Sequence, residues 1–227
     1  MITNGDDRKV REYIEKCHQA AGQTDYFQKR GITKDSVEQF RLGYDPDFRE
    51  GTGNRSWQAV IIPTSDVTYE ARNVAVEPNS SEDGKNKYRK HGSATLFNGD
   101  ALVEEKERPI FICEGAIDAI SIIQSGGQAV GLGSAANYTL LLKKLESVKP
   151  AKPLVILLDS DQIGAASADK IKEVLEKGGI PYIQDDSILQ GYHDPNNRLL
   201  KAWIITAPSG TGKTTQYRHW RDLPGMR

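Results

Sequence analysis

The sequence is poor in cysteine and has no long apolar run. Its two cysteines, Cys17 and Cys113, lie far apart and have no histidines at metal-ligand spacing. This pattern argues against a zinc site and against a disulfide framework, and it predicts a reducing, cytoplasmic compartment. No apolar stretch approaches the length of a membrane span, and the N-terminus lacks the apolar core of a signal peptide, so we expect no membrane contact.

An excess of charge of one sign is also missing, because the net charge of the 227 residues is -1 at pH 7. This balance argues against a protein that binds polyanions over its whole surface. Any contact with nucleic acid must therefore come from local patches. The length allows one large domain or two small ones, each with a hydrophobic core.

Two apolar runs that end in acidic residues organise the rest of the chain. The first, Ile110–Cys113, ends in Glu114 and Gly115, and a helical pattern over Ala116–Gln124 places Asp118 about one turn from Glu114. A strand of this kind delivers an acid to the carboxyl edge of a parallel sheet, where α/β proteins place their sites.

The second run, Leu154–Leu158, leads into Asp159-Ser160-Asp161, and Gly164 opens the next helix, Ala165–Lys177. If both aspartates continue the strand, their side chains share one face. Mg²⁺ takes oxygen ligands and is usually bound by a few carboxylates together with substrate phosphates. The two strand ends therefore predict a hard-metal site, although a glutamate at a strand end also often caps a helix and Asp-x-Asp occurs in many loops.

Further segments complete a series of βα units. The strand-like run Ala129–Leu132 is followed by a helical pattern over Asn137–Leu145, and Ile180–Ile183 follows the last helix. Repeated βα units imply a parallel sheet with helices on both faces. We therefore predict an α/β domain over residues 108–200.

Residues 1–107 have a different pattern, which predicts a small α+β subdomain. Helical patterns over Asp6–Ala21 and Lys34–Phe40 precede the β-prone stretch Trp57–Val76. The run Lys85–Lys90 then holds four cations and one aromatic residue. Such a run is usually a solvated surface, but cations beside an aromatic ring also suit a phosphate backbone with a stacked base. The candidates for a nucleic-acid contact are Lys87, Tyr88, Arg89 and Lys90.

The last segment, residues 201–227, contains a P-loop pattern over Ala207–Thr214, with alanine at the first glycine position. Gly212 and its neighbours would let backbone N–H groups hold phosphates, while Lys213 reaches them and Thr214 meets Mg²⁺. The segment has no room for the sheet of an NTPase. We therefore interpret it as the beginning of a following helicase or NTPase domain.

Several of these segments resemble a known family. Ile112–Ala119 is similar to the first motif of the TOPRIM domain, Gly131–Ala136 resembles the small-residue turn after its second strand, and Leu158–Gly164 resembles its Asp-x-Asp motif. TOPRIM domains also occur in type IA and type II topoisomerases and in small nucleases. The resemblance therefore implies a TOPRIM fold and metal-dependent phosphodiester chemistry without choosing among these proteins.

The flanking segments resemble the catalytic core of bacterial replicative primases. They are Tyr26–Tyr44, the β-prone stretch that ends in Lys87-Tyr88-Arg89, Leu96–Asn98, and His193–Asn196, which is similar to a Lys-Asp-Pro-Asp element. The sequence departs from the primase pattern in lacking an N-terminal zinc-binding module, in its short region before the TOPRIM domain, and in Asn196, which replaces an acid. With the P-loop pattern, the resemblance implies the primase portion of a primase–helicase, as in phages and mobile elements.

A primase of this type joins ribonucleotides on a single-stranded DNA template and requires Mg²⁺ or Mn²⁺. The resemblance implies that Glu114, Asp159 and Asp161 are catalytic and hold metal, with Asp118 and Asp194 as secondary ligands. The implied partners are single-stranded DNA, ribonucleoside triphosphates, and a replicative helicase or a helicase domain of the same parent chain. Two alternatives remain open: a TOPRIM nuclease, which cuts DNA or RNA without triphosphates, and a non-catalytic DNA-binding module beside a helicase.

Overall fold

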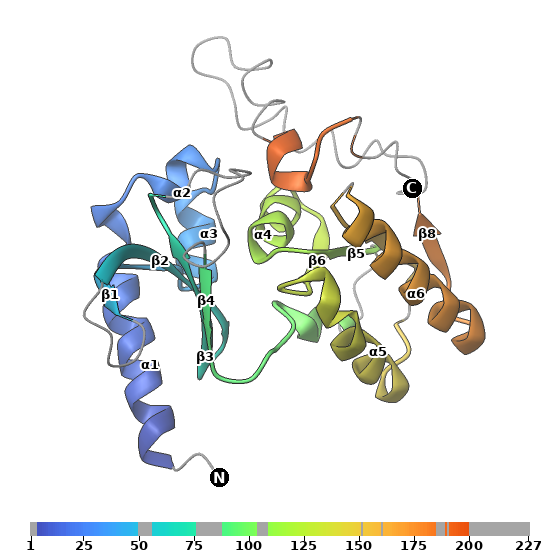
Figure 1. Ribbon diagram of the computed structural model, residues 1–227, viewed down its shortest axis with the longest axis horizontal. Helices are drawn as coiled ribbons and strands as arrows, with labels where there is room; N and C mark the ends of the chain where they lie inside the picture. The colour runs from blue at the N-terminus through green and yellow to red at the C-terminus, as the bar shows by residue number, and fades with distance from the viewer. Residues whose placement is uncertain are drawn as a thin grey trace. The chain divides into compact units, whose positions relative to one another are not determined.

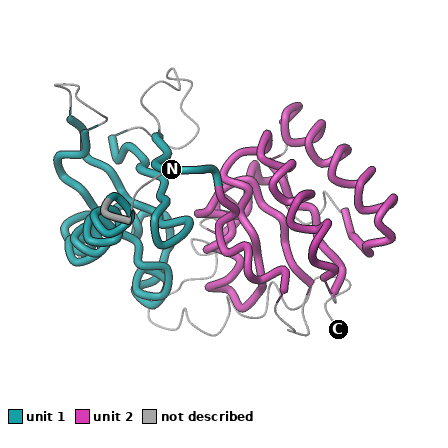
Figure 2. Tube along the Cα trace, turned by 90° about the horizontal axis from the view of Figure 1, so that it is seen from below, with its two compact units in different colours: residues 1–94 teal, residues 95–227 magenta. Residues whose placement is uncertain are grey.

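The structure, a computed structural model, contains two compact units, unit 1 (Met1–Ala94) and unit 2 (Thr95–Arg227), shown in Figure 2. It describes residues 4–49, 56–75, 88–103, 109–150, 152–159, 161–184, 189 and 191–199. The tail predicted over 201–227, with Gly212, Lys213 and Thr214, lies outside these ranges, as does Lys87.

The two units divide earlier than the 107/108 boundary that the sequence predicted. Phe97 forms an antiparallel β-bridge with Gly131, and the side-chain amide of Asn98 donates a 2.9 Å hydrogen bond to the carbonyl of Ala129. Residues from Thr95 onward therefore pack with the second sheet and belong to unit 2. No pattern of local propensity marks this change, because it depends on a pairing between segments distant in sequence.

Unit 1 is built on a four-stranded antiparallel sheet in the order β1-β2-β3-β4. Helix α1 packs against one face of this sheet, where Cys17 joins the buried side chains of Phe48, Ala59, Ile61 and Ala71. The strands are β1 (Gly43–Arg49), β2 (Ser56–Ser65), β3 (Thr68–Asn73) and β4 (Tyr88–His91), and the helices are α1 (Asn4–Gln19), η1 (Ala21–Gln23), α2 (Tyr26–Lys29) and α3 (Lys34–Gln39).

Strand β1 was not predicted, because the sequence showed no strand pattern between Phe40 and Trp57. Pro46 and the neighbouring glycine and aspartates disfavour a strand interior, but an edge strand tolerates proline. β1 is an edge strand, and its register with β2 shifts between Asp45 and Phe48. The bulge removes the regular alternation on which a strand prediction depends.

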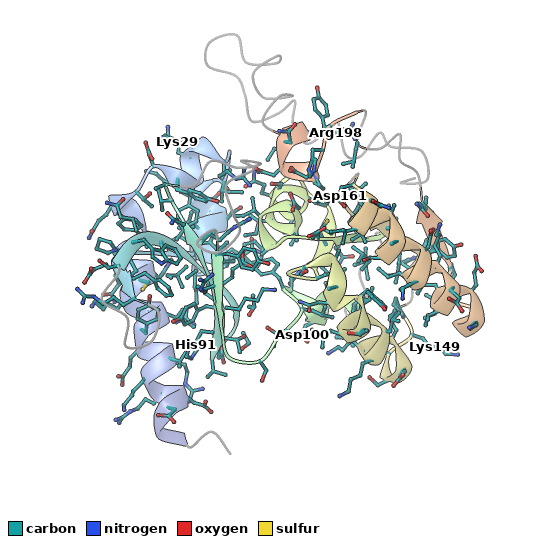
Figure 3. All side chains as sticks on the ribbon, in the orientation of Figure 1. Lys29, His91, Asp100, Lys149, Asp161 and Arg198 are labelled. Atoms are coloured by element: carbon teal, nitrogen blue, oxygen red, sulfur yellow. The ribbon has the colours of Figure 1, made fainter. Side chains whose placement is uncertain are left out.

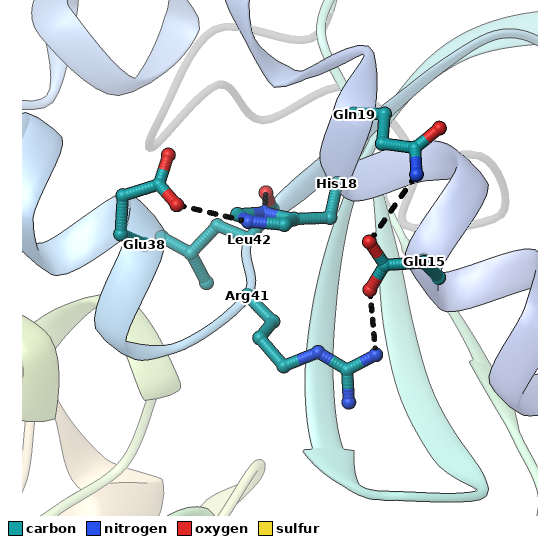
Figure 4. A network of polar contacts seen from close by, with 6 residues as sticks. All are labelled: Glu15, His18, Gln19, Glu38, Arg41 and Leu42. Atoms are coloured by element: carbon teal, nitrogen blue, oxygen red, sulfur yellow. Dashed lines mark hydrogen bonds and ion pairs between the residues drawn. The ribbon is translucent and has the colours of Figure 1, made fainter.

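Polar contacts connect α1 to the end of α3 (Figure 4). His18 Nδ1 lies 2.9 Å from the carbonyl oxygen of Leu42, and His18 Nε2 lies 3.3 Å from Glu38 Oε2. Arg41, whose φ is +50°, donates a 3.0 Å hydrogen bond to Glu15. A side chain in the left-handed region carries a backbone cost, which this contact partly offsets.

Unit 2 contains a four-stranded parallel sheet in the order β6-β5-β7-β8, which confirms the predicted fold class (Figure 1). Strands β5 (Ile110–Cys113), β6 (Gln128–Gly131) and β7 (Leu154–Leu157) are buried along their whole length, as in a parallel sheet covered on both faces. The fourth strand, β8 (Tyr182–Gln184), is partly exposed at the edge.

Helices cover both faces of the parallel sheet. Ile110 and Ile112 of β5 pack in one cluster with Leu141 of α5 and with Ile171 and Leu175 of α6. The alternate side chains of β5 point to the opposite face, and α4 contacts β5 and β6. The helical segments of unit 2 are η3 (Gly99–Leu102), α4 (Ala116–Gln124), η4 (Ala135–Asn137), α5 (Tyr138–Ser147) and α6 (Gln162–Gly178). Within the described ranges, no helix has the length and apolar character needed to cross a membrane.

Candidate metal-dependent active site

The two acidic strand ends lie next to each other in the sheet. β5 and β7 are neighbouring parallel strands, and their register pairs Cys113 with Leu157. Glu114 and Asp159 follow these positions by one and two residues, so both acids leave the sheet at its carboxyl edge. The predicted site required these two strands to be neighbours, and they are neighbours in the structure.

Glu114 precedes the N-cap position of helix α4. The N-cap residue is Gly115, which has no side chain to cap the helix. Asp118 lies in the first turn of α4, on the same edge of the sheet.

The second strand end differs from the prediction. β7 ends at Leu157, and Asp161 is the N-cap of α6, where its Oδ1 accepts a 2.7 Å hydrogen bond from the backbone N–H of Gly164. The condition under which Asp159 and Asp161 would share one strand face is therefore not met. The chain turns directly into the helix, because an Asp N-cap is favourable and because a Cβ at Gly164 would lie only 2.1 Å from the carbonyl oxygen of Asp159. Figure 3 shows Asp161 at the start of α6.

A third segment, at the end of the described chain, brings a fifth acid to this edge. Asp194 Oδ1 accepts a 2.6 Å hydrogen bond from the backbone N–H of Asn197 and so begins a short helical segment, residues 195–199. His193 Nδ1 lies 3.8 Å from Asp159 Oδ2 and 3.5 Å from Asp194 Oδ2. His193 was not among the predicted site residues. The resemblance of His193–Asn196 to a primase element could have pointed to it.

The carboxylates at this edge repel one another. Burial, followed by the negative charges of Asp118, Glu114, Asp194 and Asp161, raises the pKa of Asp159 to about 8. Asp159 Oδ1 is buried, and no hydrogen-bond partner for it lies in the described part of the chain. The other four predicted acids therefore all act electrostatically on Asp159.

Comparison with known proteins identifies the domain that carries these acids. Residues 111–199 match the Toprim-like family. Unit 2 contains a TOPRIM domain. The matched range includes both strand ends and the segment that carries Asp194.

Solved structures share the fold of the chain at low sequence identity. The primase fragment of the bacteriophage T7 primase-helicase protein is 16% identical, with a TM-score of 0.56 over 77% of this chain and 69% of that chain. A structure of the bacteriophage T7 lagging-strand DNA polymerase with primase domains bound to an RNA/DNA hybrid and dTTP has a chain that is 17% identical, with a TM-score of 0.49 over 77% of this chain and 84% of that chain. No curated protein sequence matches significantly.

The donor atoms of the TOPRIM site fit a hard divalent cation. TOPRIM domains bind ions such as Mg²⁺, which prefers carboxylate oxygens. The surplus of negative charge and the buried, unbonded oxygen of Asp159 are consistent with such an ion. Among the described residues, no three His, Cys, Asp or Glu side chains lie close enough together to hold one ion by themselves. Each ion would thus take one or two carboxylates and complete its shell with water and substrate oxygens, as Mg²⁺ commonly does.

A cavity of about 270 Å³ lies beside the second strand end. Asp159, Asp161, Gln184 and Tyr192 line it together with apolar residues of β7 and α6. Cys113, which precedes Glu114, is fully buried, and burial raises the pKa of its thiol well above the ordinary value. A thiol in this state is a poor nucleophile, so the chemistry of the TOPRIM site belongs to its carboxylates.

Three of the four predicted nucleic-acid residues, Tyr88, Arg89 and Lys90, lie in unit 1 on the edge strand β4. The register pairs Tyr88 with Arg72 and Lys90 with Glu70. Because side chains alternate along a strand, Tyr88 and Lys90 share one face, while Arg89 lies on the other. Tyr88 is exposed, and Lys90 Nζ lies 5.6 Å from the centroid of its ring. The structure therefore divides the predicted basic run between two faces of the sheet.

Proposed function

We propose that this chain is the catalytic portion of a DNA primase, which joins ribonucleotides on a single-stranded DNA template. The observation that carries the proposal is the group of mutually repelling carboxylates at the carboxyl edge of a TOPRIM sheet. The fold likeness to a primase fragment supports it, because that likeness covers more of the chain than unit 2 alone contains. Because this chain is only 16% identical to that fragment, the likeness shows the fold, and the primase activity is what we propose.

In the proposed reaction, the 3′-hydroxyl oxygen of the primer attacks the α-phosphorus of a ribonucleoside triphosphate. A new phosphodiester bond forms, the bond to the bridging oxygen breaks, and pyrophosphate leaves with that electron pair. Bound divalent ions would neutralise charge on the attacking and leaving oxygens. Asp159 and Asp161 would hold Mg²⁺ or Mn²⁺, Glu114 would serve as a ligand or accept the proton of the hydroxyl, and Asp118 and Asp194 would be secondary ligands.

The template would contact the edge strand of unit 1. Lys90 and Arg89 can neutralise phosphates, and Tyr88 offers an exposed ring on which a base can stack. The P-loop pattern with Lys213 supports a neighbouring helicase domain as partner. In this proposal, Lys87 extends the same basic run.

The test is to incubate the protein with single-stranded DNA, labelled ribonucleotides, and Mg²⁺ or Mn²⁺. We expect short labelled oligonucleotides from the wild type and none from the Asp159→Ala/Asp161→Ala double variant. Circular dichroism of both proteins provides the control for folding. Synthesis by the double variant would overturn the assignment of the site.

The same assay separates the alternatives. Cutting of the DNA without any requirement for triphosphates would identify a nuclease instead. DNA binding that survives loss of both acids, with no metal-dependent product, would identify a binding module.

A further inference from the structure

Asn196 occupies the position at which the primase pattern has an acid, and it is completely buried, with 0% of its surface exposed. Its side-chain nitrogen donates a 2.9 Å hydrogen bond to the hydroxyl of Ser121, in the interior of α4. Its backbone N–H donates a 3.2 Å hydrogen bond to Asp118 Oδ1. Asn196 thus contacts two residues of α4, Asp118 and Ser121, which lie more than seventy positions earlier in the sequence.

The other carboxylate oxygen of Asp118 lies over the start of α4. A Cβ added at Gly115 would lie 2.7 Å from Asp118 Oδ2. Asp118 therefore folds back over the turn that follows Glu114, with Oδ1 bound to Asn196 and Oδ2 over Gly115. The backbone N–H of Asn196 thus holds one of the two carboxylate oxygens of Asp118.

We propose that Asn196 is a positioning residue of the TOPRIM site. It orients the carboxylate of Asp118 and holds the segment with His193 and Asp194 beside Asp159, without contacting an ion itself. The inference rests on the proposed function only in assuming that these acids bind a divalent ion. It explains how the site can function with an amide in the place of an acid.

The chemistry of the buried contact favours an amide over a carboxylate. The hydroxyl of Ser121 already donates to the carbonyl of Ile117 at 2.8 Å, so it meets Asn196 as an acceptor. An amide nitrogen can donate to this oxygen, whereas an ionised carboxylate cannot.

The first test compares Ser121→Ala with Ser125→Ala. Both hydroxyls are buried and donate to the carbonyl four residues earlier in the chain, but Ser121 alone of the two accepts from Asn196. Mn²⁺ binding is measured in the whole chain from the loss of the paramagnetic resonance signal of free Mn²⁺. We expect Ser121→Ala to weaken binding about tenfold, as for residues that support metal ligands, and Ser125→Ala to stay within about twofold of the wild type.

The second test is Asn196→Asp, with Asn196→Ala beside it. If Asn196 positions Asp118, both variants bind Mn²⁺ more weakly than the wild type, and Asn196→Asp unfolds at a lower temperature than the wild type. Tighter Mn²⁺ binding by Asn196→Asp would show that this position belongs to a ligand, and it would overturn the proposal. Equal Mn²⁺ affinity in Ser121→Ala, Ser125→Ala and the wild type would overturn it as well.

These measurements separate the inference from the proposed function. Mn²⁺ binding is measured without template or triphosphates. A wild type that binds Mn²⁺ but makes no primer would refute the primase function, and the Mn²⁺ affinities of the variants would still test the role of Asn196. A wild type that makes primers while all four variants bind Mn²⁺ normally would refute the role of Asn196 alone.

Discussion

The acidic residues of the two units are placed in opposite surroundings. In unit 1, Glu15 accepts a hydrogen bond from Arg41, and this contact holds the pKa of Glu15 below its ordinary value. The hydroxyl of Ser56, followed by Arg49, lowers the pKa of Asp47 in the same way. In unit 2, burial and four neighbouring acids raise the pKa of Asp159 to about 8.

The difference belongs to one edge of a sheet and not to unit 2 as a whole. Glu173, on the exposed surface of α6, pairs with Lys177, and its pKa is lowered like those of unit 1. These three exposed acids are therefore each close to a cation, whereas Asp159 lies among other acids at the carboxyl edge of β5 and β7. A strongly perturbed acid that lies among other acids is typical of functional sites.

The largest effect is expected from removing the charge of Asp159. Asp159→Asn keeps the shape of the side chain but removes the charge that an ion would bind, so we expect primer synthesis to fall at least about 100-fold. The matched control is Asp169→Asn, which changes an exposed aspartate of α6 that pairs with Lys172. Equal activity of Asp159→Asn and Asp169→Asn in the synthesis assay would contradict the distinction between the two kinds of acid.

The next largest effect is expected at Gly164. The added methyl group of Gly164→Ala would collide with the carbonyl oxygen of Asp159, so the turn must move and both aspartates with it. We expect the free energy of unfolding to fall by about 1–3 kcal/mol, as for other overpacked sites, with a loss of Mn²⁺ binding. Urea unfolding and Mn²⁺ titration measure the two effects. Ala165→Gly, at the exposed next position of α6, serves as the control for helix propensity.

The charge of Asp159 should destabilise the metal-free protein at high pH. Its pKa is raised in the folded state, so its favourable contribution is complete below the ordinary value near 4 and is lost as the pH rises towards about 8. In EDTA, the free energy of unfolding should therefore fall over this interval. Asp159→Asn should remove most of the fall and be more stable than the wild type at pH 8 by roughly 1–3 kcal/mol, a range discounted for partial exposure.

The sign of this effect distinguishes the two surroundings. Asp47 and Glu15 have lowered pKa values, so their contributions are present above the ordinary pKa and are lost only as the pH falls below it. Asp47→Asn should leave the slope between pH 5 and 8 unchanged in the same urea series. If the free energy of unfolding fell by the same amount in Asp159→Asn and in the wild type, groups other than Asp159 would cause the pH dependence.

A smaller effect is expected on template binding by the edge strand. Lys90→Ala should weaken binding of single-stranded DNA by about 1 kcal/mol and reduce the salt dependence by about one phosphate contact. Arg8→Ala, on the exposed surface of α1, should change neither quantity. Fluorescence anisotropy at several salt concentrations measures both. If the salt dependence of DNA binding were unchanged in Lys90→Ala, the basic run would be only a solvated surface.

The smallest effect concerns the backbone at Arg41. Both Arg41→Ala and Arg41→Gly lose the contact with Glu15, but glycine accepts the positive φ without strain. We expect Arg41→Gly to be more stable than Arg41→Ala by about 1 kcal/mol in thermal unfolding. The opposite order would mean that the turn relaxes out of the left-handed region.

The sequence was most informative where local propensity and burial agree. The run Ile110–Cys113 and the helix Ala116–Gln124 have the predicted bounds, because a fully apolar strand and an apolar helix meet at an unambiguous Glu-Gly junction. Asp159 and Asp161 were less predictable. Their spacing fits a strand, but the hydrogen bond of Asp161 to Gly164 starts a helix instead.

Contacts between distant segments were beyond the sequence argument. The role of Asn196 depends on Ser121 and Asp118, which no local pattern connects with residue 196. The edge strand β1 was missed for the same reason, since it depends on pairing with a strand elsewhere in the chain. Local patterns located the acids, and tertiary contacts decided how they are oriented.

The most direct test of the account is the number of protons released when Mg²⁺ binds. Titration calorimetry at pH 6.5, in buffers with different enthalpies of ionisation, gives this number, because a carboxyl group must lose its proton before it can hold an ion. We predict release of about one proton per ion in the wild type, and of almost none in Asp159→Asn. Binding without proton release in the wild type, or with equal affinity in Asp159→Asn, would contradict the claim that the acids of this edge are gathered for a divalent cation.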